Sequence, residues 1–529
     1  MKHHNENSIS NSKKIRIDPL TIKDNTQSKR LYFEDLPVEL FIYYLFPYLQ
    51  QHEIIQIFFN LNYSFQQIVI SYFDRNKNID LRQISQSWLL KYLPNLLSKI
   101  SIMNINDKQI ENIFQSSSSL SKLQSLFITN IKHLPSAKFL KNLKSLKQLK
   151  YLHLSGNKNE YKLYINAYVD FNMFASFFEE DSLLESFILI RTLPLSLANN
   201  YFNTMSYCVQ NLTIDLLHLT DLTRLLTSFP SLKSFYVKIA NGEYYINEKR
   251  SNFLLPKLVQ CHFECKFITQ SDLNYFLDQL KQSTLLQTFK LKINDIEKLY
   301  DNNEIVEKLS NFKNIHFYIQ FHELDFQHEI IQNSFNNHRL LWYKTDYPNY
   351  YSCLSLPYSF KELLNVSNNI VDHNRNDQKD ILLFPTVEHI EISYKENQLS
   401  PKLIQFINNQ FPNLFTIEIR LYNLHEELMN DKNLILNKVR KLIINYTNER
   451  SYYDIKRLLL LTSNIEILII DYINFITHKR KLSHDGELIT ICRQIKILII
   501  TDCTDGLDSD EEDYIRNKIF KNLEKLVVQ

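Results

Sequence analysis

The residues of this chain that could bind a metal lie in the segment Cys261-His262-Phe263-Glu264-Cys265. This segment offers two thiols and an imidazole, which are ligands that zinc prefers. Alternation along a strand would place Cys261 and Phe263 on the buried face and His262 on the other face. No second pair of cysteines or histidines stands at zinc-finger spacing. We therefore interpret the two cysteines as core residues and predict no metal site.

The other segment with potential chemistry is the acidic run DCTDGLDSDEED at residues 502–513. It lacks the alternating oxygen ligands and the correctly placed glycine of a calcium-binding loop, so we interpret it as a solvated loop between repeats. The sequence also lacks Gly-x-Ser-x-Gly and His-Glu-x-x-His, two common hydrolase motifs. We predict no catalytic residue, and a protein that is not an enzyme.

The composition excludes several further classes of function. Only four glycines occur, and no two are close enough to form a phosphate-binding loop, so we expect no nucleotide cofactor. We expect no other cofactor either. The net charge of +2 attracts neither nucleic acid nor anionic lipid. No apolar run is long enough to span a bilayer, and the start of the sequence resembles no secretory signal. The six cysteines show no disulfide framework, which favours a cytoplasmic or nuclear location.

The elements that would position these residues form a repeat. Each unit is an apolar residue, two spacers, an apolar residue, one spacer and an apolar residue, so the last two apolar side chains share one face of a short strand. Segments between the units, such as residues 272–280, have helical periodicity. The units begin at Leu97, Leu123, Leu149, Leu184, Val209, Leu232, Leu258, Leu286, Phe312, Val387, Leu414, Val439, Ile465, Ile495 and Leu523.

One strand and one helix of this size cannot bury their apolar faces alone, so we expect neighbouring units to stack. The pattern resembles the leucine-rich-repeat family, which implies an α/β solenoid with parallel strands inside and helices outside. The alternative is an ordinary α/β domain with a parallel sheet. The full family motif occurs at Leu149-x2-Leu152-x-Leu154-x2-Asn157 and at Ile495-x2-Leu498-x-Ile500-x2-Cys503.

The other units lack the final Asn or Cys and would lose a turn hydrogen bond, so we expect irregular repeats. The pattern also lapses at about residues 320–384. This interval contains either degenerate repeats or an insertion. An extra pair of strands at the edge of the solenoid and a break between two arrays are both compatible with its aromatic, alternating sequence.

A dense apolar segment, residues 33–69, precedes the repeats. Its start has helix signals, because Asp35 can cap, Pro37 fits the first turn and Glu39 complements the helix dipole. Pro47 should end or kink the first helix. So small a helical unit with so much apolar surface suggests a partner that covers it.

Leu36-Pro37-Val38-Glu39-Leu40 and Leu45-Phe46-Pro47-Tyr48-Leu49 resemble the two halves of the F-box motif. The Val-Cys and Trp that are usual in the third helix of that family are absent. The resemblance implies a helical unit that binds a Skp-type adaptor and, through it, a cullin ubiquitin ligase. The adaptor-binding residues that it implies are Leu36, Pro37, Glu39, Leu40, Leu45, Tyr48 and Leu49.

Together these patterns predict a disordered polar tail at 1–29, a small all-α F-box at 30–72, a linker helix at 73–96 and an irregular leucine-rich-repeat solenoid at 97–529. This architecture implies a substrate-recognition subunit of a Skp–cullin–F-box ubiquitin ligase, whose repeats bind a protein substrate. The alternative is a repeat scaffold or inhibitor outside the ubiquitin pathway, whose N-terminal helices cap the solenoid. No membrane or nucleic-acid partner is expected.

Each strand also has one outward residue between its two core positions. These outward residues are polar from Tyr236 to Glu418 and apolar after that. The apolar residues either bind a partner or are covered within the chain. We predict a substrate site with Lys441, Asp471 and Lys525 as its polar rim. Its apolar residues are Ile443, Ile469, Ile499 and Val527. The predicted buried strand residues include Leu152, Leu154, Phe289, Leu291, Ile417 and Ile419.

Overall fold

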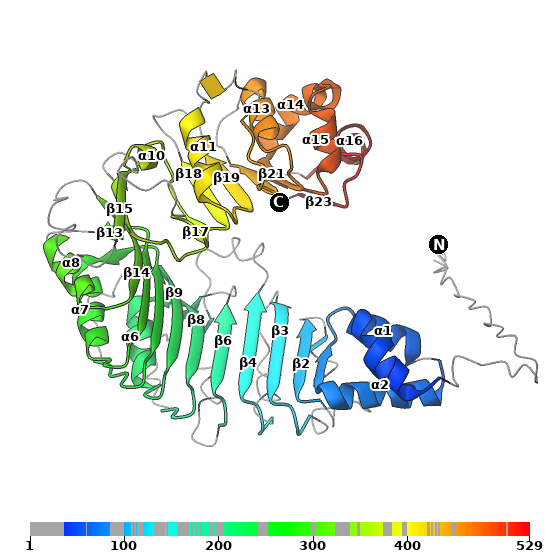
Figure 1. The fold of residues 1–529 in the computed structure, drawn as a ribbon, viewed down its shortest axis with the longest axis vertical. Coiled ribbons are helices and arrows are strands. Elements are labelled where there is room, and N and C mark those ends of the chain that lie inside the picture. Colours follow the sequence, from blue (N-terminus) through cyan, green and yellow to red (C-terminus); the bar gives the residue numbers. More distant parts are fainter. Residues whose placement is uncertain are drawn as a thin grey trace, which may run out of the picture. The chain divides into compact units, whose positions relative to one another are not determined.

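The computed structural model describes residues 36–84, 100–131, 143–156, 169–241, 252–322, 339–373, 383–393 and 399–528, with shorter gaps inside several of these ranges. The chain divides into two compact units, Met1–Lys162 and Leu163–Gln529, and each is described by itself (Figure 1). The predicted polar tail lies outside the described residues. Within the described part of the chain, no helix is long and apolar enough to cross a membrane.

The first unit begins with short helices around an aromatic core. Phe41, Phe46, Phe58 and Phe65 are buried, and their rings contact one another with centroids 5.1–6.2 Å apart. Pro47 ends the first helical segment in a 3-10 turn, as its missing N–H predicts. The elements are η2 (Leu40–Leu45), η3 (Phe46–Tyr48), α1 (Gln51–Phe58) and α2 (Tyr63–Asn76).

The helices lead directly into a parallel sheet. Lys77 ends α2 in the left-handed conformation, with φ of 54°, and a strand follows at once. Residues 78–80, which we expected in a linker helix, are therefore a strand, and residues 85–99 lie outside the described residues. The strands of this unit are β1 (Asn78–Asp80), β2 (Ile102–Asn106), β3 (Ser125–Ile131) and β4 (Tyr151–Gly156).

The register of these strands corrects the start of the first repeat. Met103 pairs with Leu126 and Ile105 with Ile128, so the unit begins at Ile100 rather than at Leu97. The prediction was wrong by three residues because a methionine occupies the position that a leucine holds in the neighbouring units. The strand β1 pairs with β2 in the same parallel register and adds a repeat strand that the pattern did not predict.

The second unit contains two large sheets and a separate sheet of two short strands. In the first, six parallel strands are followed by an antiparallel pair at the edge, β16 on β14 and β15 on β16. These strands are β6 (Ser186–Ile190), β8 (Asn211–His218), β9 (Ser234–Asn241), β10 (Gln260–Cys265), β12 (Thr288–Ile293), β14 (Ile315–His322), β15 (Arg339–Lys344) and β16 (Tyr350–Leu356). The helices and short strands of this part of the unit are α6 (Leu219–Thr227), α7 (Gln270–Lys281), α8 (Asn302–Ser310), β5 (Val169–Asp170) and β7 (Leu195–Ser196). The separate sheet is the parallel pair β11 (Ile268–Thr269) and β13 (Ile296–Glu297).

The second sheet is wholly parallel. The interval at 320–384 thus holds both an extra pair of strands and the start of a second array. The strands are β17 (Glu362–Leu363), β18 (His389–Ser393), β19 (Thr416–Arg420), β20 (Lys441–Ile444), β21 (Ile467–Asp471), β22 (Ile497–Thr501) and β23 (Lys525–Val528). The helices are α10 (Asn369–His373), α11 (Pro401–Gln410), α13 (Tyr452–Leu461), α14 (Tyr472–His484), α15 (Ile489–Gln494), α16 (Ser509–Tyr514) and η9 (Ile515–Ile519).

The core residues of the strands are buried as the repeat predicts. The predicted set is at most 1% exposed, and its strands are parallel to their neighbours, which confirms the α/β solenoid of leucine-rich-repeat type with a small helical unit before it. That set is Leu152, Leu154, Phe289, Leu291, Ile417 and Ile419.

The turns before the strands carry a repeated hydrogen-bond pattern. One carbonyl accepts two backbone N–H groups from the next unit, as Lys77 does from Ser101 and Ile102. In several units without the motif Asn, an asparagine just before the strand unit donates to the preceding turn instead. The pairs are Asn413 to the Pro385 carbonyl at 2.7 Å, Asn464 to that of Asn437 at 3.1 Å and Asn522 to that of Arg493 at 2.9 Å.

Candidate protein-binding surfaces

The helical unit at the N-terminus has an exposed apolar line. Leu40, Tyr44 and Tyr48 follow one another at a spacing of four residues and are 42%, 69% and 85% exposed. Phe41 and Phe46 lie on the other side of the same turns and fill the aromatic core. We call Leu40, Tyr44 and Tyr48 the N-terminal line. A line of large apolar side chains on the outside of a filled core is a surface suited to a protein partner.

The predicted adaptor residues fall around this line. Four of them are exposed, and three are half-buried. The exposed ones are Pro37, Glu39, Leu40 and Tyr48, and the half-buried ones are Leu36, Leu45 and Leu49. The sequence analysis missed Tyr44, although its spacing from Leu40 and Tyr48 could have indicated it. It also missed Tyr43, which is held by a hydrogen bond of 2.6 Å from the Arg75 guanidinium to its hydroxyl.

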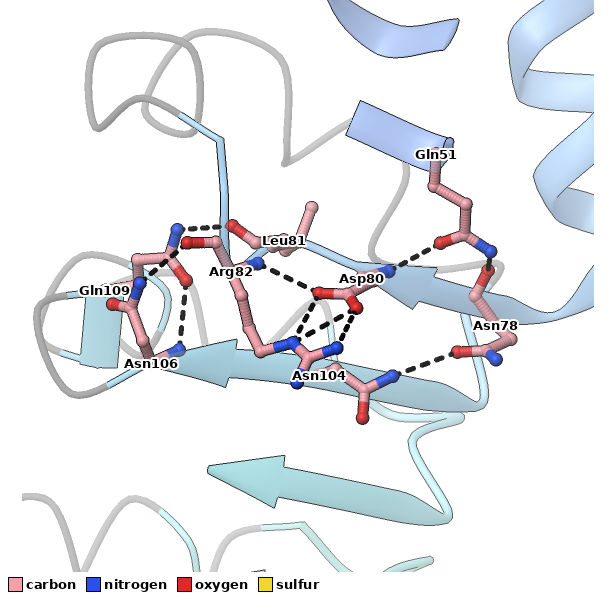
Figure 2. Close-up of polar contacts among 8 residues, drawn as sticks. All are labelled: Gln51, Asn78, Asp80, Leu81, Arg82, Asn104, Asn106 and Gln109. Atoms are coloured by element: carbon pink, nitrogen blue, oxygen red, sulfur yellow. Dashed lines mark hydrogen bonds and ion pairs between the residues drawn. The ribbon is translucent and has the colours of Figure 1, made fainter. Parts of the chain in front are cut away.

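Polar side chains tie the helices to the first strand (Figure 2). The Gln51 side chain of α1 donates to the Asn78 carbonyl at 3.4 Å and accepts from the Asp80 N–H at 2.6 Å. These two groups flank Ile79 and are the ones that a neighbouring parallel strand would bond. Gln51 therefore supplies one rung of a missing strand, and the helices protect that edge of the sheet.

The same network continues from β1 into β2. Arg82 donates to the Asp80 carboxylate at 3.0 and 3.1 Å, and Asn106 donates to the Arg82 carbonyl at 2.8 Å. Burial by itself would raise the pKa of Asp80, but the hydrogen bonds and charge of Arg82 lower it. Gln109 donates to the Leu81 carbonyl (Figure 2) and also to the Ile84 carbonyl. These hydrogen bonds join the helices to the first two strands of this unit.

The outward face of the first sheet in the second unit is charged. Asp215, Lys238, Glu264 and Lys292 are direct neighbours on four adjacent strands, so negative and positive side chains alternate. Glu264 lies 3.1 Å from His262. Burial alone would raise the pKa of Glu264, but the nearby His262 imidazole and the charge of Lys292 lower it to about 2. This row keeps Glu264 ionised inside the protein.

Residues 357–364, the crossing segment, lie against this charged face. The Lys290 ammonium donates to the Ser359 carbonyl at 3.4 Å, and the His262 and Phe360 rings are 5.6 Å apart. Lys292, with a side chain only 7% exposed, lies 3.3 Å from the Glu362 carboxylate. The polar part of the outward face is therefore occupied here by the chain itself.

The cysteines next to this face are core residues. Cys261 and Cys265 are 2% and 3% exposed, and burial raises the pKa of both thiols, that of Cys265 to about 12. A neutral buried thiol is a poor nucleophile and a poor metal ligand. In the part of the chain that the structure describes, no group of three or more His, Cys, Asp or Glu residues is placed to hold a metal ion.

The outward face of the second sheet is apolar over four strands. Ile443, Ile469, Ile499 and Val527 are direct neighbours in one row, and Ile467 and Ile497 are neighbours in the row beside it. We call these six residues the isoleucine patch. Ile443 is 8% exposed, and the other five are half-buried. The sequence analysis missed Ile467 and Ile497, which precede Ile469 and Ile499 by two residues and so share their face.

The border of the patch differs in part from the expected rim. Lys525 is exposed and Lys441 half-buried, but Asp471 is only 3% exposed and caps α14 by accepting from the Asn474 N–H at 2.9 Å. Asp471 is therefore a structural residue, because a helix start needs an acceptor there.

Beside the patch, Glu418 is held by polar partners. Its carboxylate accepts from Arg420 at 2.8 Å and from Asn445 at 2.7 Å, and His389 lies 3.6 Å away. Burial would raise the pKa of Glu418, but the nearby His389 imidazole and the charge and hydrogen bonds of Arg420 lower it to about 2. The polar end of the second sheet is thus internally satisfied, and its apolar end is the larger uncommitted surface.

Comparisons with known proteins give similarity only among solved structures. No family model matches the sequence, and no curated protein matches it. The structure of the leucine-rich-repeat protein LIC12759 of Leptospira interrogans is similar at 15% identity and a TM-score of 0.26, over 86% of this chain and 97% of that one. The leucine-rich repeat-containing protein LegL7 from Legionella pneumophila is similar at 9% identity and a TM-score of 0.21, over 85% of this chain and 90% of that one. The fold assignment rests on the strand register and burial described above.

Proposed function

We propose that this chain is a substrate-recognition subunit of a cullin-type ubiquitin ligase. The N-terminal helices bind a Skp-type adaptor and through it a cullin, and the repeats bind the protein to be ubiquitinated. The proposal starts from the solenoid, whose repeats form a scaffold with an apolar sheet face suited to protein binding. The ligase role rests, in addition, on the resemblance of the N-terminal motif to the F-box.

The observation that carries the proposal is the N-terminal line. Its three side chains are exposed although the unit already buries an aromatic core, so much of their apolar surface lies outside the packing of the helices. Large exposed apolar side chains lower solubility unless a partner covers them. The proposed adaptor site comprises Leu36, Pro37, Glu39, Leu40, Leu45, Tyr48 and Leu49, to which the structure adds Tyr44.

The second candidate function, a repeat scaffold with capping helices, is favoured by the contacts of Gln51 and Lys77. Both residues join the helices to the first strands. However, capping uses Gln51 and the end of α2, whereas adaptor binding would use the N-terminal line. The two roles involve different faces and are compatible. What separates the candidates is whether the line binds an adaptor.

Affinity purification of the tagged full chain tests this directly. We expect a Skp-type adaptor and a cullin to co-purify with the wild type, and the variant Leu40→Ala with Tyr48→Ala to lose both, since truncating an apolar anchor costs about 2 kcal/mol. Tyr48 is preferred to Leu45 because the half-buried Leu45 also packs within the helices. Tyr207→Ala, which removes an exposed tyrosine elsewhere in the chain, is the control. A wild type without adaptor, or a double variant that retains it, would leave the capped scaffold as the function.

A further inference from the structure

We propose that the isoleucine patch binds an amphipathic α-helix that carries an acidic side chain at one end. The partner that presents this helix, the ubiquitination substrate, rests on the proposed function, whereas the helical form of the ligand is argued from the patch alone. The patch is part of a sheet face formed by β20 to β23.

The backbone under the patch determines the form of the ligand. The strands β20, β21 and β22 are each hydrogen-bonded to a neighbour on both sides, so their peptide groups are already used. An extended peptide laid on this face would bury its own N–H and C=O groups against isoleucine side chains without partners, which is costly. A helix satisfies its backbone internally and presents only side chains.

The reverse face of the same strands displays this mode of packing. Leu468, Ile470 and Leu498 alternate with the patch residues, and they are buried in one cluster with Phe475 and Leu482 of α14. The patch has branched aliphatic residues of the same size at the same spacing. It therefore offers a helix the kind of surface that the other side already uses.

The dimensions of the patch fit two to three helical turns. Three strand spacings of ~4.8 Å give a length of about 14 Å from Ile443 to Val527. At a rise of ~1.5 Å per residue, about ten helical residues cover that length. Apolar side chains at i, i+3, i+4 and i+7 of such a helix would contact the two rows of the patch.

The border of the patch sets the preferred charge. Lys525 is exposed on β23 beside Val527, and Lys441 occupies the same row on β20. At the other border the Glu418 carboxylate already accepts hydrogen bonds from Arg420 and Asn445. An acidic side chain near the β23 end of the bound helix would therefore meet a lysine, and a basic one would be disfavoured.

The test measures fluorescence anisotropy of labelled peptides with the full chain. The first probe is an alanine-based helix of 16 residues with leucines at i, i+3, i+4 and i+7 and one terminal glutamate. The second probe has lysine in place of the glutamate, and the third has the first composition with a proline at its centre. We expect the glutamate peptide to bind best and the proline peptide to bind at least about tenfold more weakly.

Variants of the protein locate the binding. The double variant Ile469→Ser with Ile499→Ser should bind the glutamate peptide at least about tenfold more weakly, because both isoleucines lie at the centre of the patch. Ile473→Ser, which changes an isoleucine that is 55% exposed on α14, is the control and should bind normally. Lys525→Glu should weaken binding of the glutamate peptide about threefold to tenfold and strengthen binding of the lysine peptide. Lys521→Glu should change the affinity for neither peptide.

Three results would overturn the proposal. They are equal binding of the proline peptide, unchanged binding by the Ile469 and Ile499 variant, and a concentration-dependent dimer that this variant abolishes, which would make the patch a contact between copies of this chain. Adaptor capture separates this site from the proposed function. A wild-type chain that captures the adaptor but does not bind the glutamate peptide would reject the helix site alone. A wild-type chain that binds this peptide but captures no adaptor would reject the ligase role alone.

Discussion

The sheet that contains β8 to β14 and the sheet that contains β18 to β23 use the same repeat, and their outward faces differ in kind. On the first, Asp215, Lys238, Glu264 and Lys292 form an alternating charged row, and the crossing segment lies against it. On the second, the corresponding rows become the isoleucine patch, whose members lie outside the buried core cluster.

This difference shows that one repeat pattern can serve two purposes. The core positions are apolar in both sheets because stacking requires it. The outward positions are not constrained by that core, so they carry what is specific to each array. The first array uses its outward face to hold the start of the second array, and we propose that the second array keeps its apolar face for a partner.

The largest expected effect contrasts the two faces of one strand. Ile470→Ala should lower the free energy of unfolding by about 3 kcal/mol, because this residue is 1% exposed and its loss leaves a cavity. Ile469→Ala should cost only about 1 kcal/mol, since its side chain is half-buried on the outward face. Chemical denaturation of both variants measures the difference. Equal losses of stability would mean that the isoleucine patch is buried like the core, which would contradict the difference between the two faces.

The next effect is a pH dependence that belongs to the charged face. Folding lowers the pKa of Glu264 from its usual 4.5 to about 2. A lowered pKa stabilises the fold fully above pH 4.5 and loses that stabilisation as the pH falls toward 2. Glu264→Gln should therefore lower stability at pH 7 by on the order of 2 kcal/mol and flatten the decline below pH 4.5.

Denaturant midpoints of the wild type and of Glu264→Gln, measured between pH 7 and pH 3, test this pH dependence. Glu307→Gln, which changes an exposed glutamate on α8, is the control. If the stability of Glu264→Gln falls with pH as steeply as that of the wild type, Glu264 does not cause the pH dependence.

A smaller effect should separate the crossing segment from the rest. Lys292→Ala should destabilise the second unit by about 1–2 kcal/mol, less than a fully buried ion pair, because the Glu362 side chain is 50% exposed. A double-mutant cycle with Glu362→Ala isolates the coupling, and Lys281→Ala on the surface of α7 is the control. Additive effects of Lys292→Ala and Glu362→Ala would show that this ion pair does not hold the crossing segment.

The repeat could be predicted because its information is local. Leu126 and Ile128, like Ile417 and Ile419, alternate along one short strand, and this spacing alone places them in the core. The first unit was misplaced because Met103 carries the pattern with a different side chain. The strand β1 was missed because its core residue Ile79 and the buried Leu81 just after it follow a helix without a spacer of the usual length.

The surfaces were only partly predictable, because cover depends on residues distant in sequence. The sequence around His262 and Lys290 does not indicate that Phe360 and Ser359 contact them. The isoleucine patch, in contrast, follows from alternation, and Ile467 and Ile497 could have been included by applying it to every outward position. The N-terminal line could be anticipated in part, since the F-box resemblance includes Leu40 and Tyr48, whereas Tyr44 needed the helical spacing.

The most direct test of the difference between the two faces is a photocrosslink from each. Benzoylphenylalanine is placed at position 469 in one full-length chain and at position 236 in another, and the crosslinked peptides are identified by mass spectrometry after irradiation in cells. From position 236, beside His262, we expect a crosslink within the chain to residues 357–364. From position 469 we expect a crosslink to another protein. A crosslink from position 469 to a segment of the same chain, or one from position 236 to another protein, would contradict the assignment of the two faces.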